Sequence, residues 1–216
     1  MESLSIDIVS DVVCPWCYIG KRRLEAALAS PEAAGLPPVR IAWHPFQLNP
    51  ELPPEGIDRK AYLEEKFGGP ERAATIYERV RAAGRTAGLE LNIDGITRQP
   101  NTRLAHALID FAQRHGGDAT DVKERLLRAY FIENRFIGDA EVLAAIAAEA
   151  GLDTTAARAY LDDPQALAAI DQADQEARQM GISGVPFFIF NRKVAVSGAQ
   201  EPATLVGAMR QALAQA

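Results

Sequence analysis

Two cysteines offer the clearest chemistry in the chain, Cys14 and Cys17, with Pro15 and Trp16 between them. A Cys-x-x-Cys pair predicts a centre that switches between a dithiol and a disulfide. Half of a zinc site can have the same spacing, but tetrahedral zinc needs two further ligands. The histidines that could supply them have no close ligand spacing and stand at His44, His106 and His115. A structural disulfide closing so short a loop would add little stability, so we expect a redox-active pair and no metal.

The residues around the pair predict a strand that ends shortly before it and a helix that begins with it. Side chains alternate over residues 4–9, which indicates a strand. Pro15 suits the first helical position because its fixed φ is helical and its missing N–H would have had no partner. Cys14 then becomes the N-cap, where free N–H groups and the partial positive charge of the helix end favour a thiolate. We therefore predict that Cys14 is the nucleophile.

Cys17 is expected to be the resolving thiol. It shares one helical face with Gly20, Leu24 and Leu28, and that face should pack on the sheet. Cys17 would then be shielded and Cys14 exposed, so that one sulfur attacks a partner and the other resolves the mixed disulfide. Pro15 and Trp16 should shape the site, since one removes an N–H donor and the other adds an aromatic surface.

For other polar residues near the pair, two interpretations of their role stay open. Asp7, on the polar face of the first strand, is a candidate proton acceptor for Cys17 or else a solvated aspartate. His106 could face a groove between domains or be a structural histidine. The run from Lys21 to Arg23 is interpreted as a solvated helix face.

Composition limits the classes of protein to which the chain can belong. With 216 residues, 48% of them hydrophobic and 24% charged, it should fold as one unit or as one domain with an insertion. The net charge of -6 predicts binding neither to nucleic acid nor to an anionic membrane. No apolar run reaches the roughly twenty residues of a membrane span, and the N-terminus has no targeting pattern, so we expect a soluble cytoplasmic protein. Two cysteines in a reducing compartment favour a cycling pair, and the excess of arginine over lysine fits a GC-rich bacterial genome.

The remaining pattern predicts a particular order of elements. Residues 39–44 read as a second strand, residues 49–58 as a connector, and the following hundred residues as helices with N-caps at Thr102, Thr120, Asp139 and Thr154. A helix over 164–180, strands over 186–190 and 193–196, and a helix over 202–213 complete the chain. This order predicts an α/β thioredoxin fold with a large all-helical insertion. Residues 1–57 and 163–216 would form the thioredoxin-like domain and residues 58–162 the insertion.

These motifs resemble those of a known family, the DsbA-like thioredoxin-fold proteins of the cytoplasmic FrnE type. The resemblance covers essentially the whole chain. It rests on residues 10–20 (SDVVCPWCYIG), 45–50 (PFQLNP), 101–106 (NTRLAH) and 181–188 (GISGVPFF). It implies a disulfide oxidoreductase without bound metal. Some relatives carry a second cysteine pair in a C-terminal extension, which this chain lacks, so no function that needs a second dithiol is expected.

The same resemblance implies a cis peptide bond between Val185 and Pro186, facing the dithiol. Pro186 has no N–H to give to a strand partner, so the backbone groups of Val185 would be free to bind an extended substrate segment beside Cys14. Val185 and Pro186 are therefore predicted substrate-binding residues.

We hypothesise an enzyme, a thiol-disulfide oxidoreductase that cycles Cys14 and Cys17 with protein or small-molecule thiols and disulfides. No tightly bound cofactor is expected, with glutathione as a candidate redox partner and a homodimer left open. The alternative is a glutathione-dependent isomerase or transferase of the same architecture. Such enzymes typically have serine in place of the first cysteine, which weighs against this alternative. A redox-sensitive binding or chaperone module is a third class that no residue positively favours.

Overall fold

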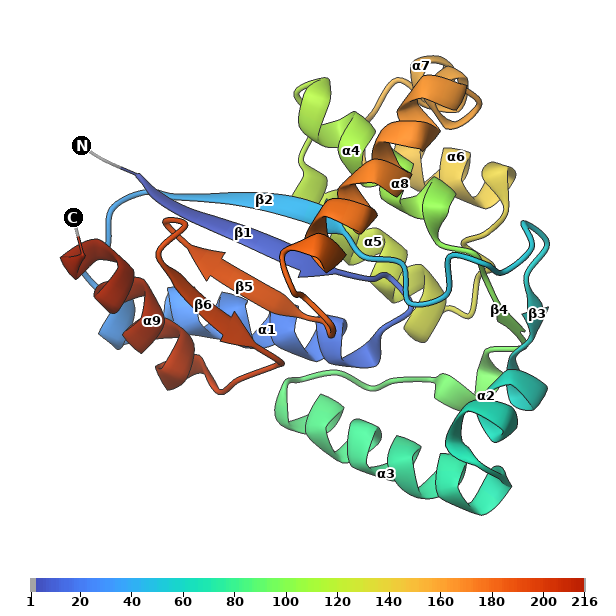
Figure 1. Cartoon of the computed structure of the whole chain (residues 1–216), viewed down its shortest axis with the longest axis horizontal. Coiled ribbons are helices and arrows are strands. Elements are labelled where there is room, and N and C mark those ends of the chain that lie inside the picture. Colours follow the sequence, from blue (N-terminus) through green and yellow to red (C-terminus); the bar gives the residue numbers. More distant parts are fainter. Residues whose placement is uncertain (1–2, 216) are drawn as a thin grey trace.

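A four-stranded mixed sheet forms the centre of the molecule (Figure 1). The computed structural model describes residues 3–215. The strands lie in the order β2-β1-β5-β6, with β1 parallel to β2 and the other two pairs antiparallel. Their bounds are β1 (Leu4–Ser10), β2 (Val39–Pro45), β5 (Phe187–Phe190) and β6 (Val194–Ser197).

Three helices complete the thioredoxin-like part of the chain. Figure 1 shows α1 (Pro15–Ala29) and α9 (Pro202–Ala214) together on one side of the sheet and α8 (Pro164–Gln179) on the other. Each begins with the proline that the sequence predicts, because proline is favourable at the first helical position. The predicted thioredoxin fold is confirmed.

The segment between β2 and α8 is mostly helical. Its helices are α2 (Arg59–Phe67), α3 (Pro70–Thr86), α4 (Arg103–Arg114), α5 (Ala119–Phe131), α6 (Ala140–Glu149) and α7 (Thr154–Leu161). Two short strands, β3 (Ile57–Asp58) and β4 (Arg98–Gln99), pair antiparallel within it, so the expectation of an all-helical insertion was incomplete. Short 3₁₀ turns lie at Pro31–Ala33 and Ile93–Gly95. Across residues 3–215, none of the helices is both long and apolar enough to cross a membrane.

Two predicted helix starts were wrong by one or two residues. The N-caps of α5 and α7 are Asp118 and Asp153, and not Thr120 and Thr154. Each of the two carboxylates accepts hydrogen bonds from two N–H groups of its first helical turn. A short carboxylate satisfies these otherwise unpaired donors, which explains why the helices begin after the aspartates.

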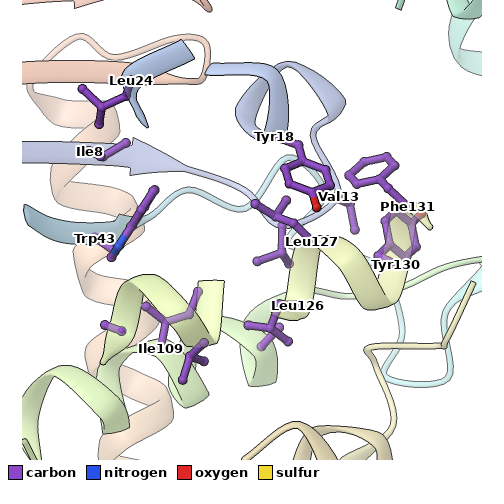
Figure 2. Packing of buried hydrophobic residues seen from close by; sticks show 14 of the residues in the cluster. Ile8, Val13, Tyr18, Leu24, Trp43, Ile109, Leu126, Leu127, Tyr130 and Phe131 are labelled. Atoms are coloured by element: carbon purple, nitrogen blue, oxygen red, sulfur yellow. The ribbon is translucent and has the colours of Figure 1, made fainter. Parts of the chain in front are cut away.

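The helical segment and the sheet share one hydrophobic core, and α5 packs against the start of α1. In Figure 2, Leu127, Tyr130 and Phe131 of α5 lie beside Val13 and Tyr18. The rings of Tyr18 and Phe131 have centroids 6.3 Å apart. Fully burying a side chain of this size contributes about 1.5–3 kcal/mol. This packing fixes the N-terminal end of α1, where the cysteines lie.

The basic residues of α1 are not a solvated face, which corrects that interpretation. Lys21 is buried, and its ammonium group lies 2.8 Å from the carboxylate of Glu124 on α5. Arg22 also pairs with Glu124, and Arg23 lies 2.7 Å from Glu201 before α9. Helix α5 covers the side of α1 that carries Lys21 and Arg22, so these two charges connect the two parts of the chain.

Candidate active site

Cys14 is the N-cap of α1, as predicted. Its backbone is extended, with φ -93° and ψ 113°, and its carbonyl accepts a hydrogen bond from the Cys17 N–H at 3.0 Å. The expected capping hydrogen bonds from the first helical turn are not formed by the Cys14 Sγ atom. It lies instead 3.6 Å from the carbonyl oxygen of Val185.

Both thiols are buried, so the expectation that Cys14 is exposed was wrong. The exposed fraction is 6% for Cys14 and 2% for Cys17. Helices α2 and α3 cover the end of α1 and leave a cavity of about 210 Å³, which Cys14 lines and Cys17 does not. Trp16, 39% exposed, lies at this cavity too, together with Pro15. The difference between the two thiols is therefore access to a cavity and not exposure to bulk solvent.

The pKa values of the two thiols are shifted in opposite directions. The thiol of Cys17, acting as a donor, and the nearby N–H groups of Cys17 and Trp16 lower the pKa of Cys14 despite its burial. Burial and the neighbouring Cys14 raise the pKa of Cys17 well above that of an ordinary thiol. Since the thiolate is the attacking species, Cys14 is ready to attack while Cys17 keeps its proton.

A buried carboxylate lies directly behind Cys17. Asp11 is fully buried, and its N–H donates to the Cys17 Sγ at 3.4 Å. Its carboxylate accepts hydrogen bonds from the N–H groups of Val12 and Leu48, both at 2.8 Å, and from Nε2 of His106 at 3.1 Å. Burial raises the pKa of Asp11, but the bond to His106, with smaller contributions from Leu48 and Lys123, leaves the pKa below its usual value. Asp11 is thus an anion held in the interior.

A buried amine completes this cluster. Lys123 of α5 is 1% exposed, and its ammonium group lies 5.4 Å from the centre of the Trp43 ring. Burial lowers the pKa of Lys123 to about 8, although the negative charges of Cys17 and Asp11 act in the opposite direction. An amine with this pKa can take up or release a proton near neutral pH.

The structure places the other candidate residues of the sequence elsewhere. Asp7 lies on β1 with its Oδ1 2.8 Å from Nε2 of His44, and it makes no hydrogen bond with Cys17. His106 is a buried histidine bound to Asp11, which matches its structural reading. Asp11 takes the place beside Cys17 that Asp7 was considered for.

The segment before β5 faces Cys14. The Val185–Pro186 peptide bond is cis, and the Val185 carbonyl is the group that contacts the Cys14 sulfur. A glycine on α1 permits this approach, since a Cβ atom at Gly20 would lie 2.9 Å from Cγ of Pro186. Gly20 therefore lets this segment pack directly against the helix that carries the cysteines.

Sequence reasoning missed Asp11 and Lys123 as site residues. A signal existed for each. Asp11 is a lone carboxylate beside the apolar Val12 and Val13, and Lys123 falls on the same helical face as Leu127 and Tyr130. What the pattern cannot show is that Asp11 bonds to Cys17 through its N–H and that the charge of Lys123 acts on both of these residues. Among residues 3–215, no group of three or more histidine, cysteine, aspartate or glutamate side chains is placed to hold a metal ion.

The fold and the dithiol site together define a family. The model of the DSBA-like thioredoxin domain matches residues 5–210, and the chain belongs to this family. It is 26% identical over 193 residues to the uncharacterised protein YwbO of Bacillus subtilis, covering 89% of each chain. The resemblance inferred from the motifs is thereby confirmed at the level of the DsbA-like family.

One solved structure supports the same family, and two more distant ones share the fold. A probable DsbA oxidoreductase of Streptomyces coelicolor is 32% identical, with a TM-score of 0.85 over 99% of this chain and 91% of that one. The cytosolic disulfide reductase DsbM of Pseudomonas aeruginosa has a TM-score of 0.71 at 18% identity, covering 98% and 100% of the two chains. A 2-hydroxychromene-2-carboxylate isomerase has the same TM-score at 16% identity, covering 98% and 97%. The last two comparisons show a shared fold.

Proposed function

We propose that the protein is a thiol-disulfide oxidoreductase of the cytoplasmic FrnE type that cycles Cys14 and Cys17 between dithiol and disulfide. The observation that supports the proposal best is the difference between the two thiols in pKa and in access to the cavity. Cys14 has a lowered pKa and reaches a cavity, while Cys17 has a raised pKa and lies against the buried Asp11. Exchange needs this asymmetry, because one sulfur attacks the substrate and the other displaces it.

In the reducing direction, the Cys14 thiolate attacks one sulfur of a substrate disulfide. A mixed disulfide forms, and the other half of the substrate leaves as a thiolate. The Cys17 thiol then loses its proton to solvent, and the resulting thiolate, which the positive charge of Lys123 stabilises, attacks the Cys14 sulfur. The second half of the substrate leaves as a thiolate, so that the substrate gains two electrons and the protein holds a Cys14–Cys17 disulfide. The same steps in reverse oxidise a dithiol, and two equivalents of a small thiol such as glutathione regenerate the reduced protein.

The segment around Val185 would hold the substrate. Its carbonyl lies beside the Cys14 sulfur, and Pro186 has no N–H, so this backbone can pair with an extended segment that carries the reacting sulfur.

Single cysteine variants test this proposal. Treatment of Cys17→Ser with bis(2-hydroxyethyl) disulfide should accumulate a mixed disulfide on Cys14, seen as a single adduct by mass spectrometry. Cys14→Ser should form no adduct under the same conditions, because Cys17 is buried and holds its proton. An adduct on Cys17 in Cys14→Ser, or undiminished turnover by either variant, would contradict the assignment.

A glutathione-dependent isomerase is the second candidate, and the cavity beside Cys14 favours it because it can hold a small molecule. This function predicts that activity survives when Cys17 is replaced. Measured exchange that depends on both cysteines would exclude it.

A further inference from the structure

A buried arginine lies in the wall of the cavity that Cys14 lines. Arg59 is the first residue of α2 and is 2% exposed. Among residues 3–215, no carboxylate lies within ion-pair distance of its guanidinium group. The neighbouring Asp58 turns its side chain to the N–H of Ala61. A buried charge without a counter-ion is costly, so Arg59 needs an explanation.

The hydrogen bonds of Arg59 do not neutralise its charge. Nη1 donates to Oε1 of Gln99 at 2.5 Å and to the hydroxyl of Tyr130 at 2.6 Å, and Nη2 donates to the hydroxyl of Tyr77 at 3.1 Å. Burial raises the pKa of both tyrosines, so their hydroxyls stay protonated and supply no negative charge. The two aromatic rings, 5.6 and 5.3 Å from the guanidinium carbon, stabilise the cation only in part.

Two donors of the guanidinium group remain unused. A guanidinium has five N–H donors, and three of them are engaged. The Nε atom is buried without a partner, and one N–H of Nη2 is also unassigned. A carboxylate that binds one donor on each of two nitrogens is the partner that a guanidinium prefers.

The charges around the cavity favour an anion there. Its lining contains two cations, Arg59 and Lys66, and no aspartate or glutamate. Arg59 also borders a second cavity between α2 and α3, where Glu64, Glu78 and Asp94 offset the charges of Lys60 and Arg81. In a chain with a net charge of -6, Arg59 and Lys66 are the charged side chains of this cavity besides the Cys14 thiolate, and both attract an anion.

We propose that Arg59 binds the carboxylate of an acidic low-molecular-weight thiol or disulfide whose sulfur reacts with Cys14. The inference rests on the proposed role of Cys14 as the reacting thiol. A cavity of about 210 Å³ has room for a small molecule beside Cys14 and not for a folded segment of protein. The bound carboxylate would complete the hydrogen bonding of Arg59 and hold the substrate sulfur next to the thiolate. Lys66, which is exposed, would add a weaker attraction at the edge of the cavity.

Alkylation with a matched pair of probes tests the proposal without any redox step. Iodoacetate and iodoacetamide differ by one charge, and each forms an S–C bond with the Cys14 thiolate while iodide leaves. The rate with iodoacetate divided by the rate with iodoacetamide should be about tenfold or more higher for the reduced protein than for a free small thiol. A charge-assisted hydrogen bond contributes at least that factor. In Arg59→Gln the ratio should fall to that of the free thiol. Arg85→Gln removes an exposed arginine that lines neither cavity and should leave the ratio unchanged.

A second experiment uses disulfide substrates and the wild-type protein. Dithiodiglycolate, which carries two carboxylates, should react faster than the neutral bis(2-hydroxyethyl) disulfide, although bulk repulsion between thiolate and anion acts in the opposite direction. A disulfide-linked peptide with a free C-terminal carboxylate should react no faster than its C-terminal amide, which separates a small thiol from a peptide as the source of the carboxylate. If Arg59→Gln fails to fold, Lys66→Gln should still lower the anionic preference by about two- to threefold, as expected for one exposed charge.

The outcomes separate the two proposals. Exchange with both disulfides but no preference for the anionic probes would overturn the role of Arg59 and leave the oxidoreductase proposal standing. An Arg59-dependent preference for iodoacetate without any disulfide exchange would support the anion site and refute the proposed function. A preference that persists in Arg59→Gln, or a preference for the peptide acid over its amide, would overturn the inference.

Discussion

Lys123→Met should stabilise the protein while slowing its chemistry. The pKa of Lys123 is lowered from 10.5 to about 8, with burial as the largest cause. A pKa difference of one corresponds to about 1.4 kcal/mol, so holding the ammonium group charged inside the protein costs about 3 kcal/mol. Methionine has a similar length and no charge, so at pH 7 the variant should gain about that free energy of unfolding.

The pH dependence of this gain follows from the direction of the shift. Below pH 8 the lysine is charged in both the folded and the unfolded chain, and the full cost is present. Between pH 8 and 10.5 the unfolded chain binds more protons than the folded chain, so the wild-type protein gains stability as the pH rises. Above pH 10.5 the lysine is neutral in both states and the advantage of the variant disappears.

Urea unfolding of the reduced proteins, followed by circular dichroism at pH 7 and at pH 9 to 10, measures the difference. Lys60→Met is the matched control, because Lys60 is exposed and its replacement should change the free energy of unfolding by less than about 0.5 kcal/mol. Two results would show that burying the charged ammonium group does not destabilise the protein. One is a lower free energy of unfolding for Lys123→Met than for the wild type at pH 7. The other is a stability difference that does not shrink at higher pH. The second readout is the release of a mixed disulfide from Cys14, which should slow because the Cys17 thiolate loses the positive charge that stabilises it. Unchanged release would refute the role of Lys123 in that step.

Two further predictions concern the same end of α1. The alkylation rate of the reduced protein should rise with pH around a midpoint below 9.0, since the pKa of Cys14 is lowered and only the thiolate reacts. A midpoint at or above 9.0, or equal labelling of Cys17, would contradict the pKa shifts assigned to the two thiols. Gly20→Ala should destabilise the protein by about 1 kcal/mol despite the better helix propensity of alanine, because the new methyl group would meet Pro186 at 2.9 Å. Gly207→Ala, in α9 with open space around it, should stabilise the protein by about 0.5–1 kcal/mol. Thermal unfolding measures both variants. If their unfolding temperatures shifted in the same direction, the steric reasoning would be refuted.

The parts of the fold that were predicted depend on local signals. Pro15, Pro164 and Pro202 each begin a helix, because the preference of proline for the first helical turn needs no tertiary contact. The apolar run before Asn191 forms the inner strand β5, and the turn after it uses positive φ angles at Asn191 and Arg192. In contrast, two helix starts were misplaced because aspartate competed with a nearby threonine for the capping position.

The site was predictable only where its residues are neighbours in the chain. Cys14 and Cys17 follow from their spacing, but the burial of Cys14 depends on α2 and α3, which pack over the cavity from a separate part of the sequence. The contact of Asp11 with His106 joins residues 95 positions apart, and Lys123 comes from yet another helix. Burial and charge balance of this kind arise only when the elements are packed, so they have no signature in a short motif.

The most direct test of the account is the redox equilibrium of the Cys14–Cys17 pair. The purified protein would be equilibrated across glutathione redox buffers, its free thiols would be trapped by alkylation, and the states of the two cysteines would be read by mass. A cycling dithiol should show one two-electron transition between dithiol and disulfide, at a potential of roughly -270 to -120 mV as for known dithiol proteins. A pair that stays unreactive, or that stops with glutathione attached to Cys14, would contradict the proposed function.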